Sequence, residues 1–101
     1  MFKVLTPLGF SVRCSKEWWA YISTVKHPVL TDRLDNVVTT LTDPTEIRRS
    51  IKDPEVLLFY RTVTPRFVGA VVRKENEEGF LITPYPADSL KKGEVVWSAS
   101  K

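Results

Sequence analysis

The chain has 101 residues, of which 43% are hydrophobic and 27% are charged, and its formal net charge is +3. This length fits a single domain with one core, and the composition argues against a disordered or fibrous chain. The single cysteine, Cys14, excludes an intramolecular disulfide and favours a reducing compartment, so we expect a cytoplasmic protein.

The N-terminal residues predict a short hairpin. Two β-prone runs, residues 2–6 and 10–14, are separated by Pro7 and Gly9, which supply the backbone angles of a turn. This stretch lacks the apolar run of about 7 to 15 residues that marks a signal peptide, and no run approaches the roughly 18 apolar residues of a membrane span. We therefore expect neither export nor a membrane partner.

Two helices are predicted next. Ser15 can cap the first helix with its hydroxyl, and Pro28 ends it at His27 because proline disfavours helical angles in the residue before it. Helical spacing places Trp18 in the core and leaves Trp19 open.

The second predicted helix has the clearest helical pattern in the chain. Thr31 or Asp32 can cap its start, and Pro44 follows its end. Apolar side chains recur at i, i+3, i+4 and i+7 on one face, and these are Leu34, Val37, Val38 and Leu41.

The rest of the chain predicts an antiparallel sheet. Residues 56–63, VLLFYRTV, are rich in β-branched and aromatic side chains, which is typical of a central strand. Short turns connect them to strands over residues 67–74 and 80–83, so antiparallel neighbours are expected. Pro84 and Pro86 limit pairing, so the strand should leave the sheet after residue 83.

Weaker β signals flank these strands. Residues 47–51 predict a short strand or an irregular piece, and residues 95–97 predict a last strand or a tail packed on the core. The whole pattern predicts one α+β domain over residues 1–101, with two N-terminal helices packed on an antiparallel β-sheet of about four strands and a short N-terminal hairpin.

The residue types narrow the chemistry. The chain has one histidine and one cysteine, and it carries no glycine-rich phosphate loop, nucleophile elbow or EF-hand loop. We therefore expect neither a metal nor another cofactor. Cleavage of RNA through its own 2'-hydroxyl remains compatible, because it needs only an acid, a base and cations around the phosphate.

Two side chains suit such a reaction. His27 has an ordinary pKa near neutrality, and a helix end favours its protonated form, so it suits a general acid; a surface helix stop is the alternative. Arg61 shares a face with Leu57 and Phe59, so a rigid strand would hold its cation for a phosphate. Pairing of Arg61 with a carboxylate is the alternative.

Other candidates are hydroxyls and basic pairs. Thr83 and Tyr85 share a face if extended geometry persists through Pro84, and they can offer hydroxyls to a phosphate or a 2'-oxygen; a rim aromatic is the alternative for Tyr85. Four basic residues can attract RNA phosphates or can simply be solvated, and these are Arg48, Arg49, Lys91 and Lys92.

Several segments resemble a known family: WWAYISTVKHP, VLLFYRTV, FVGAVVRK and GFLITPYPADSLKKGEVVW. Over residues 18–97 the chain resembles the phage- and plasmid-associated domains of the BECR group, which gathers barnase, EndoU, colicin ribonuclease and RelE toxin relatives. The resemblance implies two helices against a sheet of about four strands and a metal-independent RNA-cleaving activity. The family's site residues would fall on His27, Arg61, Thr83 and Tyr85, with Pro84 where the pattern usually has a small residue.

Three hypotheses follow. The first is a ribonuclease of toxin or phage type, which cleaves RNA by 2'-hydroxyl attack on the adjacent phosphate and has a protein inhibitor or antitoxin as a possible partner. The second is a non-catalytic module that binds protein or nucleic acid through the sheet. The third is a structural accessory domain without a nucleic-acid role.

Overall fold

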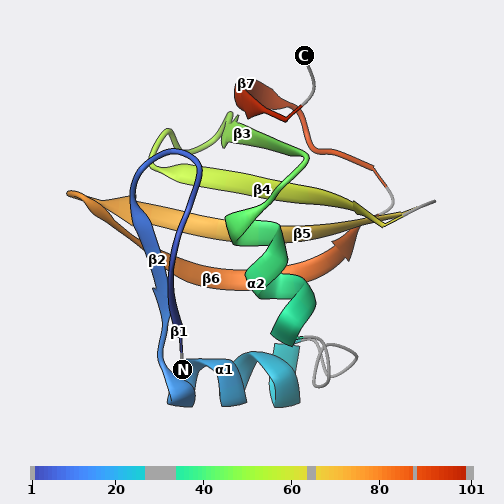
Figure 1. Cartoon of the computed structure of the whole chain (residues 1–101). Coiled ribbons are helices and arrows are strands. Elements are labelled where there is room, and N and C mark those ends of the chain that lie inside the picture. The colour runs from blue at the N-terminus through green and yellow to red at the C-terminus, as the bar shows by residue number, and fades with distance from the viewer. Residues whose placement is uncertain (1, 27–33, 64–65, 88, 100–101) are drawn as a thin grey trace.

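The computed structural model of the chain describes residues 2–26, 34–63, 66–87 and 89–99. Seven strands form one mixed sheet in the order β1-β2-β6-β5-β4-β3-β7 (Figure 1). The strands are β1 Phe2–Leu5, β2 Ser11–Cys14, β3 Glu46–Ser50, β4 Val56–Val63, β5 Arg66–Glu75, β6 Glu78–Ala87 and β7 Gly93–Ser98. The helices are α1 Lys16–Tyr21, which continues as the π-helix η1 Ile22–Lys26, and α2 Leu34–Thr42.

The prediction of two helices on an antiparallel sheet of about four strands is therefore wrong. The N-terminal hairpin belongs to the sheet, because β2 pairs in parallel with β6 from Ser11 to Arg13. At the opposite edge, β7 extends the sheet by pairing with β3. Both additions join segments that are distant in sequence, and local β-forming patterns carry no information about such pairing.

Strand β6 continues through two prolines, so the predicted departure from the sheet after Thr83 is also wrong. Pro84 and Pro86 both keep partners in β5. In an antiparallel ladder, successive residues direct their backbone groups to opposite edges of the strand, so the nitrogens of Pro84 and Pro86, two residues apart, face the same edge of β6. We assign them to the edge away from β5, where, among the described residues, β2 pairs with β6 only as far as Phe80. The missing N–H groups of the prolines therefore deprive no neighbouring strand of a partner.

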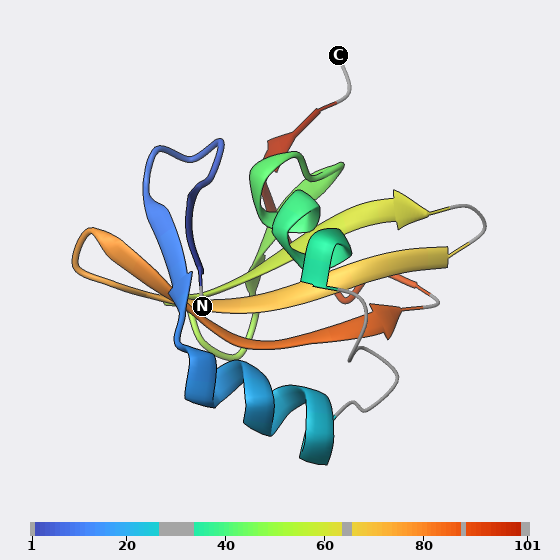
Figure 2. The ribbon, with the colours of Figure 1, turned by 60° about the horizontal axis from the view of Figure 1, so that its bottom comes forward.

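Helix α1 begins as predicted but presents a different face. The Ser15 hydroxyl accepts a hydrogen bond from the Trp18 backbone N–H at 3.1 Å, which confirms the predicted cap. Trp19 is 6% exposed in the core, whereas Trp18 is 37% exposed and stacks on Tyr21. The Trp18 indole Nε1 donates to the Ile82 carbonyl at 3.0 Å, so the ring is held against the free side of β6. Figure 2 shows α1 running along β6.

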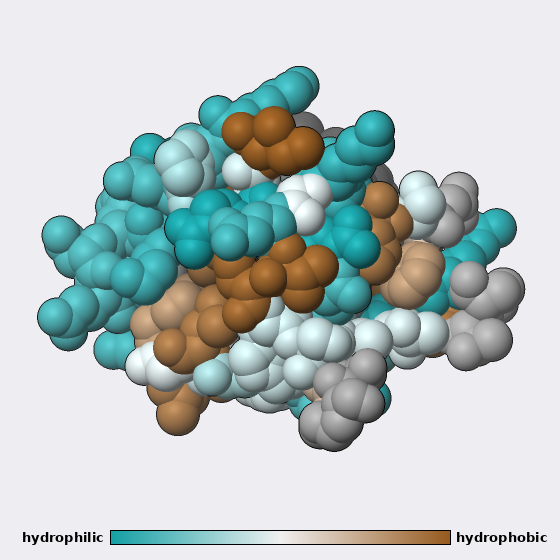
Figure 3. All heavy atoms as spheres, turned by 90° about the horizontal axis from the view of Figure 1, so that it is seen from above, coloured by the Kyte–Doolittle hydropathy of each residue, from teal (hydrophilic) through white to brown (hydrophobic). Residues whose placement is uncertain are grey.

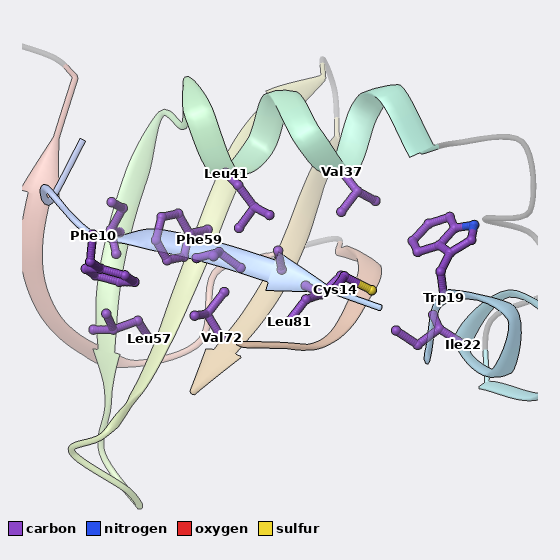
Figure 4. Packing of buried hydrophobic residues seen from close by; sticks show 13 residues of the cluster. Phe10, Cys14, Trp19, Ile22, Val37, Leu41, Leu57, Phe59, Val72 and Leu81 are labelled. Atoms are coloured by element: carbon purple, nitrogen blue, oxygen red, sulfur yellow. The ribbon is translucent and has the colours of Figure 1, made fainter. Parts of the chain in front are cut away.

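Helix α2 covers the inner face of the sheet, as we call the side that it packs on. Val37 and Leu41 are fully buried, in agreement with the predicted pattern, and both point toward the sheet, where Leu41 lies over Phe59 of β4 and Val72 of β5 (Figure 4). Burial of each such side chain contributes about 1.5–3 kcal/mol. The predicted helix end at His27 and both predicted caps of α2 lie outside the described residues.

The opposite, outer face of the sheet carries a smaller cluster of buried side chains. Leu58 and Tyr60 from β4 lie beside Ala87 at the end of β6. Leu90, in the connection between β6 and β7, packs against them. This connection therefore lies on the outer face while α2 lies on the inner face.

Hydrophobic side chains reach the surface at several places. Figure 3 shows brown hydrophobic groups separated by teal hydrophilic ones on one side of the molecule. Large exposed hydrophobic residues in the described chain include Leu5, Tyr21, Ile51 and Val95. None of the described helices is long and apolar enough to cross a membrane.

Candidate nucleic-acid interface

Arg61 and Tyr85, two of the predicted site residues, lie on opposite faces of the sheet. Along the paired strands β4, β5 and β6, Tyr60 lies beside Gly69 and Gly69 lies beside Tyr85. Tyr60 and Tyr85 therefore share the outer face. Arg61 follows Tyr60 along β4 and so belongs to the inner face. The structure does not bring Arg61 and Tyr85 together.

Arg61 is bound at the end of α2. Its Nη1 donates to the Asp43 carbonyl at 2.7 Å and lies 3.3 Å from Oδ2 of the same residue. This arrangement matches the alternative weighed for Arg61, a pairing with a carboxylate. Because both side chains are more than a third exposed, the ion pair itself contributes little, and the bond to the carbonyl fixes the position of the guanidinium.

Lys91 connects three side chains on the outer face. The hydroxyl oxygens of Tyr60 and Tyr85 are 2.9 Å apart. The Lys91 backbone N–H donates to the Tyr60 hydroxyl at 3.1 Å, and the Lys91 carbonyl accepts from Arg48 Nη1 at 2.9 Å. The Lys91 Nζ lies 5.4 Å from the centre of the Tyr85 ring, within cation–π range. We call Arg48, Tyr60, Tyr85 and Lys91 the tyrosine–lysine cluster.

The Tyr85 hydroxyl is a hydrogen-bond donor at neutral pH. Its pKa is raised, first by burial and second by the hydrogen bond with Tyr60. Both effects favour the neutral phenol over the charged phenolate. Tyr85 can therefore donate a proton into a hydrogen bond with a phosphate oxygen, but it does not supply a base.

Gly69 sets the position of the Tyr85 ring, and our sequence reasoning missed it. A Cβ at this position would lie 2.8 Å from Cε1 and Cζ of Tyr85, closer than real Cβ contacts allow. The missing side chain lets the tyrosine ring approach the backbone of β5. A glycine inside the strand FVGAVV is the signal that could have found it, because a strand glycine often marks such a close approach.

The predicted basic residues divide between the two faces. Arg48 belongs to the tyrosine–lysine cluster and also contacts the Glu46 carboxylate. Arg49 pairs with Leu57 of the inner face, and its Nε lies 3.5 Å from Glu94. Lys92 is exposed beside the cluster. The structure thus brings two of the four, Arg48 and Lys91, into direct contact.

Thr83 and His27 are the remaining predicted site residues, and the structure describes only Thr83. Thr83 lies on the outer face with Tyr85, and its hydroxyl donates to the Pro84 carbonyl at 3.1 Å. The extended geometry through Pro84, on which this shared face depended, is present in β6. His27 lies outside the described residues.

A bulge in β6 adds another aromatic side chain to the outer face. The register of β6 shifts at Ile82, where one extra residue is accommodated. The shift places Phe80 on the same face as Tyr85, although the two are an odd number of residues apart. The Arg13 Cζ lies 4.6 Å from the centre of the Phe80 ring. Strand β6 thus carries two cation–aromatic pairs on one face, Arg13 with Phe80 and Lys91 with Tyr85.

No group of three histidine, cysteine, aspartate or glutamate side chains that could hold a metal lies within the part of the chain that the structure describes. Comparisons with protein-family models, curated proteins and solved structures found no match. The site is therefore defined by its own chemistry, in which cations and aromatic rings share one sheet face. This combination suits a polyanion that carries planar bases.

Proposed function

We propose that this domain is a non-catalytic RNA-binding module that uses the outer face of its sheet. The observation that carries the proposal is the convergence of Arg48, Lys91 and Tyr85. The sequence made Arg48 and Lys91 candidate RNA contacts and Tyr85 a candidate catalytic hydroxyl. Cations attract phosphates, and aromatic side chains stack on bases with little dependence on sequence. The separation of Arg61 from Tyr85 favours binding over cleavage.

Each member of the cluster has a defined part in this proposal. The Lys91 ammonium lies over the Tyr85 ring, where it can meet a phosphate next to a stacked base. Arg48 and Tyr60 hold the Lys91 backbone at its carbonyl and its N–H, so they position the lysine. The protonated Tyr85 hydroxyl can donate to a phosphate oxygen or a 2'-hydroxyl.

The test is RNA affinity as a function of salt. We expect a single-stranded oligonucleotide to bind the wild type with a steep salt dependence, and Lys91→Gln to reduce the slope of log affinity by about 1. Lys52→Gln, which removes an exposed lysine after β3, is the matched control and should leave the slope unchanged. Absence of RNA binding at low salt, or equal slopes in all three proteins, would overturn the proposal.

The ribonuclease that the BECR resemblance implies is the second candidate. It is supported by the shared outer-face position of Thr83 and Tyr85 beside the cation of Lys91. Incubation of the protein with RNA in EDTA tests it, with His27→Ala and Tyr85→Phe as variants. Cleavage by the wild type that both variants reduce would establish the enzyme. Intact RNA after prolonged incubation, or equal cleavage by all three proteins, would exclude it.

A further inference from the structure

A pocket of about 820 Å³ opens where β2 and β6 separate. The two strands run in parallel as far as Arg13 and Phe80, after which β2 leads into α1 and β6 continues toward Ala87. Helix α1 runs along β6 (Figure 2), and its Trp18 lines the pocket. The volume is in the range of sites that hold small molecules.

Aromatic rings form the walls of this pocket. Trp18, Phe80 and Phe2 all line it. Trp18 is fixed on two sides, because its Nε1 donates to the Ile82 carbonyl at 3.0 Å and its ring stacks on Tyr21 with centroids 5.2 Å apart. A ring that is already held in place loses little conformational freedom when a ligand stacks on it.

Two cations stand at the rim. The Lys3 Nζ and the Arg13 Nε lie 3.2 and 3.4 Å from the carboxylate of Glu78. Both cationic side chains are more than half exposed. One carboxylate between two cations leaves an excess of positive charge beside the aromatic walls. The pocket is therefore complementary to a ligand with a planar ring and an anionic group.

We propose that this pocket binds one nucleotide of a single-stranded RNA, with its base on Trp18 and its phosphate on the exposed side of Lys3 and Arg13, away from Glu78. The choice of a nucleotide as the ligand rests on the proposed RNA-binding function. Stacking on a fixed indole recognises the flat shape of a base, and the two rim cations recognise the phosphate.

The pocket and the tyrosine–lysine cluster lie along one strand. Phe80 lines the pocket, and Tyr85 belongs to the cluster. Their partners in β5, Arg73 and Gly69, are four residues apart, which corresponds to roughly 13 Å along the strand. One RNA strand that follows β6 can therefore place a base in the pocket while a later phosphate reaches Lys91.

The experiment compares adenosine 5'-monophosphate, adenosine and an oligoadenylate of about eight nucleotides, with affinities from calorimetry and indole N–H signals from NMR. We expect the monophosphate to shift the Trp18 indole signal and to bind about tenfold more tightly than adenosine, since only the former engages the rim cations. Trp18→Leu, Arg13→Gln and Lys3→Gln should each weaken monophosphate binding by about tenfold. Lys52→Gln, which removes an exposed lysine after β3, should leave it unchanged.

The outcomes separate this inference from the proposed function. Oligoadenylate binding that is weakened by Lys91→Gln but not by the Trp18, Arg13 or Lys3 variants would overturn the pocket and leave the proposed function standing. Monophosphate binding without oligoadenylate binding would retain the nucleotide pocket and overturn the RNA module. A thermal melt of each variant identifies misfolding, and two rim variants guard against the failure of one. A monophosphate that leaves the Trp18 signal of the wild type unmoved would overturn the inference outright.

Discussion

The two faces of the sheet are built from the same strands but differ in chemistry: the inner face is apolar, and the outer face carries hydrogen bonds and cations. On the inner face, Phe59 and Val72 meet Val37 and Leu41 of α2 in a closed apolar core. On the outer face, Tyr60, which follows Phe59 in sequence, accepts a hydrogen bond from the Lys91 backbone N–H and is hydrogen-bonded to Tyr85, and the Lys91 ammonium lies over the Tyr85 ring. Alternation along a strand places these two chemistries one residue apart.

The comparison shows where stability and binding reside. The inner face gains its free energy from apolar area removed from water, which needs no partner molecule. The outer face holds cations close to aromatic rings, and these cations stay partly exposed to solvent. An anionic, aromatic ligand can therefore contact both. A substitution in the inner-face core should therefore change mainly stability, whereas removal of an exposed outer-face cation should change mainly binding; the buried outer-face residues Tyr60 and Gly69 still contribute to stability.

The largest expected effect is loss of stability from the inner face. Phe59→Ala should lower the free energy of unfolding by about 3–5 kcal/mol, because it leaves a cavity under α2. Urea denaturation of wild type and variant gives this difference. Val95→Ala, at an exposed position of the edge strand β7, is the control and should change it by less than about 0.5 kcal/mol. Similar losses in both variants would break the distinction between the two faces.

The next effect concerns the packing of Tyr85 on the outer face. Gly69→Ala should destabilise the protein by about 1–3 kcal/mol, because the added Cβ collides with the Tyr85 ring and pushes it from Tyr60. The same substitution in a Tyr85→Ala background is the control: Gly69→Ala should cost much less once the Tyr85 ring is absent. Denaturation of the single and double variants measures this coupling. An unchanged cost would show that the strand, rather than the ring, resists the methyl group.

A smaller effect should follow from the hydroxyls of the cluster. Tyr60→Phe removes the acceptor of the Lys91 N–H and the partner of Tyr85, so we expect a loss of about 1–2 kcal/mol. Tyr85→Phe leaves the bond between Lys91 and Tyr60 in place and should cost less. Thermal denaturation ranks the two variants. The reverse ranking would mean that the Tyr85 hydroxyl has the more important partner.

Local features were predictable from the sequence. The Ser15 cap, the buried Val37 and Leu41, and the central strand Val56–Val63 all depend on neighbours close in the chain, and the structure confirms each. Such features follow from helical spacing, capping chemistry and β propensity.

The features that were wrong depend on distant contacts. The continuation of β6 through Pro84 is possible because of where β2 departs, and the burial of Trp19 in place of Trp18 depends on how α1 lies on β6. The same holds for the candidate site. Lys91 meets Tyr85 because the connection after β6 folds over the outer face, and the bulge at Ile82 brings Phe80 to that face. No local spacing rule contains either fact.

High pH should weaken the outer face selectively. The pKa of Tyr85 is raised in the folded protein above its ordinary value of about 10, so the native state holds the proton more tightly than the unfolded chain. The resulting stabilisation is complete below about pH 10 and is lost as the pH rises through the folded pKa. Unfolding of wild type and Tyr85→Phe from pH 8 to 11 should therefore show a stability difference that shrinks above pH 10. A constant difference would mean that the hydroxyl is not held as the structure shows.

The smallest expected effect sharpens the functional side of the comparison. Arg61→Gln removes a cation from the inner face, and because this guanidinium is held by Asp43, we expect RNA affinity to stay within about twofold of the wild type. Lys91→Gln removes one cation of the same charge from the outer face and should weaken binding several-fold at low salt. Measuring both variants in the same buffer separates position from net charge, since each lowers the charge by one. Equal losses would mean that RNA responds to the overall charge of the domain, and a larger loss for Arg61→Gln would return the binding site to the inner side of β4.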